Sequence, residues 1–181
     1  AASDVYKRQT KYNKFEANRN NLSHFSVRSL CVDRAGTLWV GTYSGGVNYY
    51  NPLNNRFVFY HPLGNSEQKL YNIFGPMVYS TGSLWIATEG GGLLQFNPAT
   101  KEYTNYLLEE RPVGMHNKNI IKSLMIERES IWCGTNNGGL YRFHIPTKRF
   151  SLIHQFNEKN LGIYSIYRDS NEDIWLGTTS R

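Results

Sequence analysis

Side chains that could do chemistry are scattered along this chain, and none of the familiar catalytic patterns is present. The sequence contains no Gly-x-Ser-x-Gly, no His-Glu-x-x-His, no P-loop and no Gly-x-Gly-x-x-Gly after a strand. The histidines, which show no metal-ligand spacing, are His24, His61, His116, His144 and His154. We therefore assign no catalytic residue, no metal ligand and no cofactor, and we expect that this chain is not an enzyme.

One acidic run resembles the start of a calcium-binding loop. Asp169 to Asp173 has the Asp-x-Asn-x-Asp spacing, but Ile174 stands where such a loop needs glycine and Ser180 where it needs glutamate. Because Asp and Asn side chains also close tight turns, we interpret this run as a hairpin turn.

The candidates for ligand recognition lie in loops that we expect to open at one end of the molecule. Loops on a rigid scaffold concentrate recognition residues, and a mixture of aromatic, amide, carboxylate and basic groups suits a polyhydroxylated ligand. The candidate ligand-binding residues are Tyr43, Lys69, Glu89, His116, Asn136 and Asn137. The alternative is a solvent-exposed rim without a specific ligand.

The elements that must position these loops come from one repeated unit. Trp-x-(Gly/Ala)-Thr occurs four times, with tryptophans 46, 47 and 43 residues apart. A period in the forties with short aromatic strands and glycine-rich turns is typical of β-propeller blades. The repeated positions are Trp39, Gly41, Thr42, Gly46, Trp85, Ala87, Thr88, Gly92, Trp132, Gly134, Thr135, Gly139, Trp175, Gly177 and Thr178. We predict an all-β propeller fragment of four-stranded antiparallel blades, with about three complete blades and partial blades at both ends.

Each unit is predicted to contain four strands. In the first two units they are 27–33, 38–42, 47–51 and 56–60, then 73–79, 84–88, 93–97 and 102–106, and the third unit runs from about 120 to 153. A column of small residues marks the first strand as innermost, where strands converge: Ser29, Gly75, Ser123 and Ser165. Each tryptophan is expected to pack between neighbouring sheets, so Trp132→Ala should cost about 3–5 kcal/mol.

The chain divides into units on the same basis. Residues 1–9 fit no column of the repeat and resemble translated adapter sequence, so we interpret them as a non-native tail. The remaining units are 10–24, the end of a preceding blade and a linker, blades at 25–71, 72–118 and 119–160, and a partial blade at 161–181. We expect the chain to be a truncated piece of one propeller.

Composition excludes some classes of partner. Lysine and arginine number 20 against 14 acidic residues, a net charge of +6, but they are scattered singly, which argues against a nucleic-acid surface. Cys31 and Cys133 lie in different units, so we expect no disulfide between them. No apolar run approaches the roughly 18 residues that a membrane-spanning helix needs.

The first unit resembles the two-component regulator propeller repeat. Its run from Val27 to Val47 reads as an aliphatic strand, Asp-x-x-Gly-x-Leu-Trp-Val-Gly-Thr and Gly-Gly-Val, and the similarity extends from about Phe15 to Thr178. The chain departs from the pattern where Ala87 replaces glycine, and where Tyr79 and Glu127 stand at the aspartate position.

The resemblance implies that the intact protein is a membrane-anchored homodimer, commonly a hybrid histidine kinase with receiver and DNA-binding output. In such proteins periplasmic propellers detect oligosaccharides, and the remaining blades and downstream signalling domains would be partners of this segment. This chain contains no kinase, receiver or output motif, so no histidine phosphorylation is assigned. A binding or adhesion scaffold and a propeller lyase or hydrolase remain alternatives.

Overall fold

The structure is a computed structural model that describes residues 21–51, 53, 56–60, 74–108, 118–154 and 161–179. Within these residues the chain forms three four-stranded sheets and one two-stranded sheet. The first sheet contains β1 (Val27–Val32), β2 (Leu38–Thr42), β3 (Val47–Asn51) and β4 (Arg56–Tyr60). The second contains β5 (Phe74–Ser80), β6 (Ser83–Thr88), β7 (Leu93–Asn97) and β8 (Glu102–Tyr106).

The third and fourth sheets continue the same pattern. The third contains β9 (Ile121–Glu127), β10 (Ser130–Thr135), β11 (Leu140–His144) and β12 (Arg149–Leu152). The fourth contains β13 (Ile163–Arg168) and β14 (Ile174–Thr178). Every pairing joins strands that are consecutive in the chain and is antiparallel.

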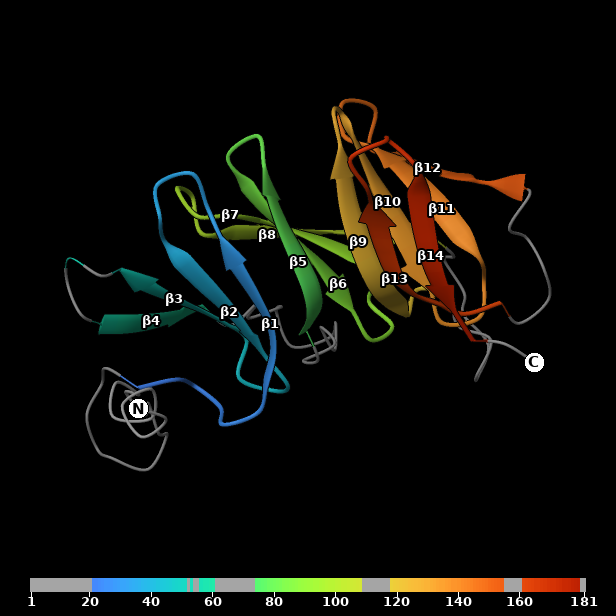
Figure 1. Cartoon of the computed structure of the whole chain (residues 1–181). Coiled ribbons are helices and arrows are strands. Elements are labelled where there is room, and N and C mark those ends of the chain that lie inside the picture. The colour runs from blue at the N-terminus through green and yellow to red at the C-terminus, as the bar shows by residue number, and fades with distance from the viewer. Residues whose placement is uncertain are drawn as a thin grey trace, which may run out of the picture.

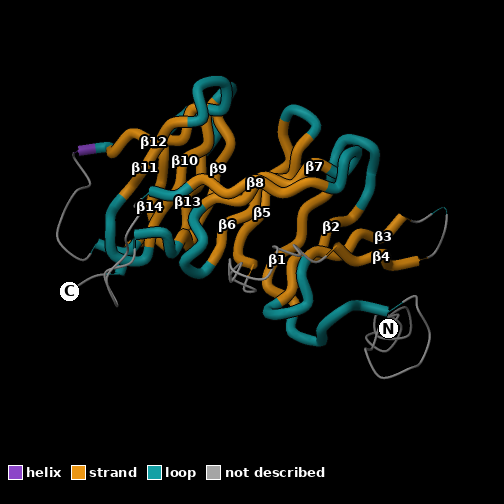
Figure 2. Tube along the Cα trace, turned by 180° about the vertical axis from the view of Figure 1, so that it is seen from behind, coloured by secondary structure: helices purple, strands orange, loops and turns teal. Residues whose placement is uncertain are grey.

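The sheets lie side by side along the chain, with their first strands adjacent to one another. β1 contacts β5, β5 contacts β9, and β9 contacts β13, an order that can be followed in Figure 1. Loops join the strands at the two ends of the sheets (Figure 2). The first strand of each sheet is therefore the innermost strand, as the sequence predicts. The predicted boundaries between blades remain predictions.

The first strand of the second unit is shifted as a whole by one residue from its predicted position. The sequence alignment places the first strand of the second unit at 73–79, but β5 runs from Phe74 to Ser80. Phe74 pairs with Thr88 as Val27 pairs with Thr42, so Phe74 and not Ile73 is the equivalent of Val27.

The shift moves two positions that the sequence analysis assigned. Counting along the ladders, Pro76 takes the place of Ser29, and Ser80 takes the place of Asp33. Gly75 is therefore not part of the small column, and Tyr79 is not at the aspartate position. Proline cannot donate to a ladder, and Pro76 lies at a register irregularity on the edge strand of its sheet, where that loss is tolerated.

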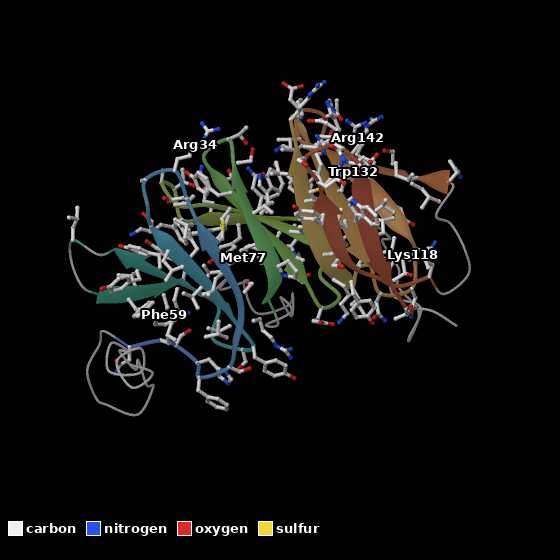
Figure 3. All side chains as sticks on the ribbon, in the orientation of Figure 1. Arg34, Phe59, Met77, Lys118, Trp132 and Arg142 are labelled. Carbon is white, nitrogen blue, oxygen red and sulfur yellow. The ribbon has the colours of Figure 1, made fainter. Side chains whose placement is uncertain are left out.

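The core lies between successive sheets. Trp39 and Val47 of the first sheet pack against Met77, Ile86 and Phe96 of the second, and Figure 3 shows Met77 in this position. A second cluster joins the second and third sheets, and its members include Trp85, Leu93, Ile131, Cys133 and Phe143. The first and second sheets therefore each bury an apolar face against the next sheet.

The burial of the four repeated tryptophans depends on the neighbouring sheet. An indole is buried by the sheet that follows in the chain, and not by the sheet to which the tryptophan belongs. Trp39 is 4% exposed and Trp85 is fully buried, and each is followed by a four-stranded sheet. Trp132, followed by two described strands, is half-buried, so its predicted place in a closed core is only partly correct. Trp175, in the last described sheet, is 63% exposed.

The small residue two places after each tryptophan has a steric cause. Gly41 pairs with Ser29, and a Cβ on Gly41 would lie 2.5 Å from Ser29 Oγ. Gly134 is similarly opposed by Ser123, and an added Cβ would also lie 2.6 Å from Ile163 O of the next sheet. In the second sheet, where no serine opposes it, Ala87 is accommodated.

Acidic side chains tie the first hairpin turn to the tryptophan. Asp169 Oδ1 accepts hydrogen bonds from Asn171 N (2.8 Å) and Asp173 N (3.0 Å), and Oδ2 accepts one from Trp175 Nε1 (2.7 Å). These contacts confirm the turn interpretation of this run. Asp33 holds Trp39 in the same way, with 3.0 Å between Oδ2 and Nε1.

Two sheets depart from this aspartate arrangement. In the third, Glu127 Oε2 accepts the hydrogen bond of Trp132 Nε1 at 2.6 Å. In the second, Ser80 stands at the acidic position, and Trp85 Nε1 is buried without a hydrogen-bond partner.

Candidate functional site

The loops between the second and third strands form rigid corners at one end of the sheets. The threonine of each complete repeat accounts for this, because Thr42, Thr88 and Thr135 each donate an Oγ1 hydrogen bond across the loop, at 2.9, 2.8 and 2.9 Å. All three are buried, and the acceptor is the carbonyl oxygen of the second glycine in the Gly-Gly pair. That glycine has a positive φ, for example 79° at Gly139, which glycine adopts without strain.

These corners meet the segments that lead into the first strands. Tyr43 N donates to Ser26 O at 3.0 Å, and Asn136 N donates to Ile120 O at 2.9 Å. Between sheets, Gly139 N donates to Leu161 O at 3.1 Å. The described loops therefore open at one end of the sheets, as predicted, and we call this end the loop rim. Arg34, labelled in Figure 3, lies on a turn at the opposite end.

A β-bulge recurs at the loop rim, at the start of each first strand. In β9, Ile121 pairs with Thr135 and Ser123 pairs with Gly134, so that Lys122 is an extra residue between them. The same irregularity occurs in β1 and β13. The bulged residues of these three strands are Arg28, Lys122 and Tyr164. Bulges re-aim side chains and are frequent beside functional sites.

The second sheet has glycine at the bulge. Phe74 pairs with Thr88 and Met77 with Ile86, which leaves two β5 residues opposite the single residue Ala87. Counting from either pair gives Gly75 as the equivalent of Lys122. The bulge is therefore present in all four sheets, but in the second it carries no side chain.

Bulged side chains contact the loop corner of the preceding sheet. Lys122 Nζ lies 2.6 Å from Glu89 Oε1, an ion pair between two partly exposed side chains. Tyr164 OH donates to Asn136 Oδ1 at 2.6 Å. The Lys122 ammonium also lies 5.9 Å from the centre of the Tyr164 ring. Glu89, Lys122, Asn136 and Tyr164 thus form one polar and aromatic group that spans three sheets, which we call the central rim cluster.

A second group lies at the rim of the first sheet. The Arg28 guanidinium carbon is 4.9 Å from the centre of the Tyr43 ring. The His24 and Phe25 rings stack at 4.4 Å, and His24 is 6.2 Å from Tyr43. Phe25 is 72% exposed and Tyr43 is 40% exposed. We call His24, Phe25, Arg28 and Tyr43 the first rim cluster.

The candidate ligand residues fall as follows. Tyr43, Glu89, Asn136 and Asn137 lie on the loop rim, and Asn136 Nδ2 donates to Asn137 Oδ1 at 3.2 Å. Lys69 and His116 lie outside the described residues. Binding of a ligand by any of these residues remains a prediction.

Sequence reasoning missed the bulged column. Arg28, Lys122 and Tyr164 each stand between an aliphatic residue and a serine at the start of a predicted strand, where a regular strand would give no reason to select them. A large polar or aromatic residue repeated directly before the small column is the signal that could have found them.

Burial raises the pKa of the Cys133 thiol, which lies between sheets and away from the rim. Both described cysteines are free. No group of three or more His, Cys, Asp or Glu side chains within the described ranges is placed to hold a metal ion. In that part of the chain there is also no helix with the length and apolar character needed to cross a membrane.

Comparison with known proteins agrees with this architecture. The family model of the two component regulator propeller matches residues 22–44 and 157–180, so these two segments are similar to the repeat of that family. The extracellular domain of a putative one component system from B. thetaiotaomicron is 30% identical over 91% of this chain, with a TM-score of 0.67. A structure described as the extracellular domain of a putative hybrid two component system from the same organism gives the same values.

A third structure shows the fold alone. The extracellular domain of another putative hybrid two component system from B. thetaiotaomicron is 20% identical over 86% of this chain, with a TM-score of 0.50. The chain spans 22% of the length of the first two structures and 28% of the third. Comparison with curated proteins found no match. The predicted fold class, a β-propeller fragment of four-stranded antiparallel blades, is confirmed.

Proposed function

We propose that this chain is a ligand-sensing segment of a propeller in the extracellular or periplasmic part of a membrane-anchored two-component sensor that detects oligosaccharides. The observation that carries the proposal is the 30% identity, across 91% of the chain, to an extracellular domain of a putative signalling system. The repeats of the two component regulator propeller support the same class. The remaining blades, a kinase and an output domain would belong to the parent protein, which we propose acts as a homodimer.

The loop rim supports binding of a polyhydroxylated molecule. The central rim cluster presents a carboxylate, an ammonium, an amide and a phenol within one group of mutual contacts. Such groups donate and accept the hydrogen bonds that sugar hydroxyls offer, and aromatic rings supply apolar contact. Because threonine-clamped corners hold these side chains, little ordering is needed on binding.

The test is a calorimetric titration of the purified chain with a panel of neutral and acidic oligosaccharides. Tyr164→Phe removes only the hydroxyl that donates to Asn136, and we expect it to weaken binding of any ligand found. Arg34→Gln, at the opposite end, is the matched control and should bind as the unaltered chain does. If no member of the panel binds, the sensing proposal is wrong.

The same titration separates sensing from catalysis. A sensor returns its ligand unchanged, so the saccharide recovered after prolonged incubation should have its original length and linkage. Shortened or unsaturated products would favour the lyase or hydrolase alternative. In the parent reading frame, a membrane span followed by a kinase would support the sensor, and its absence would favour a binding scaffold.

A further inference from the structure

We propose that Arg28 and Tyr43 form a subsite for a carboxylate-bearing sugar, at the rim position where Gly75 carries no side chain. This inference rests on the proposed saccharide-sensing function and names the class of ligand: an acidic oligosaccharide. Two features of the described residues lead to it, the interrupted pairing along the rim and the charge of the side chains left there.

The pairing rule along the rim is broken at one place. In two successive steps a bulged side chain contacts the loop corner of the preceding sheet, Lys122 with Glu89 and Tyr164 with Asn136. By the same rule the bulged residue of β5 would contact Tyr43, but that residue is Gly75. The Tyr43 ring instead lies against Arg28 of its own sheet. A side chain that fills this position elsewhere on the rim is therefore missing beside Tyr43.

The backbone at Gly75 does not require glycine. Its φ is not in the left-handed region, and the nearest atoms to an added Cβ would be Ala87 O at 3.4 Å, Ala87 Cβ at 3.6 Å and Ile121 O at 3.7 Å. These are ordinary contact distances, so neither strain nor crowding explains the residue. The pairing rule offers another explanation for the glycine, which is that it leaves room for a ligand next to Tyr43.

The charge of Arg28 differs from that of the other cation in the bulged column. Glu89 neutralises Lys122. Arg28 is exposed and forms no ion pair with a carboxylate among the described residues. Because the planar guanidinium of arginine binds a carboxylate through two parallel hydrogen bonds, Arg28 suits the acid group of a sugar.

Aromatic groups around Arg28 suit the sugar ring itself. Tyr43 and Phe25 are both exposed, and the His24 ring stacks on Phe25 and lies 6.2 Å from the Tyr43 ring. Ser26 N donates to His24 Nδ1 at 3.0 Å, which fixes the orientation of the imidazole. Exposed aromatic faces next to a cation without an ion pair suit a sugar ring that has an apolar face and one negative charge.

The experiment compares two ligands that differ only in charge. An oligogalacturonide and its fully methyl-esterified form are titrated into the full chain by calorimetry. We expect the free acid to bind at least about tenfold more tightly, since each ester removes a charge-assisted hydrogen bond. Arg28→Gln should abolish that difference without altering the thermal unfolding curve, whereas Arg34→Gln should preserve it.

A second variant tests the Gly75 position directly. Gly75→Tyr introduces the residue found at the same place in the fourth sheet, and it should weaken binding of the free acid by occupying the space beside Tyr43. Equal affinity for acid and ester, or preserved discrimination in Arg28→Gln, would overturn the inference. If neutral oligosaccharides bind while the acid does not, the inference fails and the sensing function stands. If no saccharide binds, both fail.

Discussion

Trp85 and Trp175 occupy the same position of the same motif, yet one is fully buried and the other is 63% exposed. Trp85 lies between two four-stranded sheets, and its ring is 5.4 Å from Phe143 of the following sheet. Trp175 belongs to the last described sheet and lacks such a neighbour among the described residues. The repeated motif therefore supplies an indole for burial, while the stability gained depends on the neighbouring sheet.

The hydrogen bonding of the two indoles does not follow their burial. The exposed Trp175 donates a hydrogen bond to Asp169, whereas the buried Trp85 has no partner for its N–H. Lys148 Nζ lies 4.8 Å from the centre of the Trp85 ring and 3.3 Å from Gln95 Oε1. A cation over the ring is not limited to this repeat, because the Arg142 guanidinium carbon lies 6.0 Å from the centre of the Trp132 ring, whose N–H is hydrogen-bonded.

The largest expected difference between the two sites is in their response to truncation. Trp85→Ala should lower the free energy of unfolding by about 3–5 kcal/mol, because it removes a buried aromatic side chain. Trp175→Ala should cost less than about 1 kcal/mol, as at other exposed positions. Half-buried Trp132 should fall between them, below the cost predicted from sequence for a fully buried residue. Urea denaturation of each variant measures these differences, and equal costs at Trp85 and Trp175 would contradict the comparison.

Replacing the glycine two residues after the tryptophan with alanine should also distinguish an inner sheet from the last described sheet. At Gly134 a Cβ would meet Ser123 Oγ and Ile163 O of the next sheet, so Gly134→Ala should cost about 1–3 kcal/mol. At Gly177 only Ser165 opposes the new Cβ. Ser165→Gly should therefore relieve Gly177→Ala fully, while Ser123→Gly should relieve Gly134→Ala only in part. Double-mutant cycles by urea denaturation measure the rescue, and full rescue at both sites would exclude the contact between sheets.

A smaller effect is expected from giving Trp85 the acceptor that it lacks. Ser80→Glu copies the third sheet, where Glu127 accepts the hydrogen bond of Trp132 after a turn of the same length. We expect a gain of about 1 kcal/mol in the free energy of unfolding, since a buried donor becomes satisfied. The control is Ser80→Glu in a Trp85→Phe background. The phenylalanine side chain has no N–H, so the glutamate should give no gain in the free energy of unfolding there. An equal gain in both backgrounds would mean that the glutamate acts elsewhere.

The spacing of residues in the sequence was sufficient to predict those parts of the fold that are determined within a single repeat. The strands predicted at 38–42, 47–51, 56–60, 93–97 and 102–106 agree with the structure residue for residue. Tight turns and alternating apolar residues have local causes, so they can be read without knowing the neighbours.

Features that depend on pairing between strands could not be predicted from the sequence in the same way. Ile73 and Phe74 are both apolar, so either could begin the second unit, and only the ladder selects Phe74. The bulge at Lys122 is a property of register, and its contact with Glu89 joins two sheets. The candidate site was therefore predicted in its loops but not in the strand residues that complete it.

The smallest effect concerns the protonation of Asp169. The hydrogen bond from Trp175, with those from the backbone of Asn171 and Asp173, lowers the pKa of this carboxyl below its ordinary value. A lowered pKa in the folded state stabilises the protein above the unfolded pKa of about 4, and this contribution is lost as pH falls through the folded value. The indole N–H resonance of Trp175 should therefore shift in NMR spectra below about pH 4, and Asp169→Asn should remove the shift. The Trp85 resonance, which has no acidic partner, should stay constant while the chain remains folded. Parallel titration of both indoles therefore distinguishes the exposed site, which has an acidic partner, from the buried one. A Trp175 resonance that stays constant would contradict the prediction.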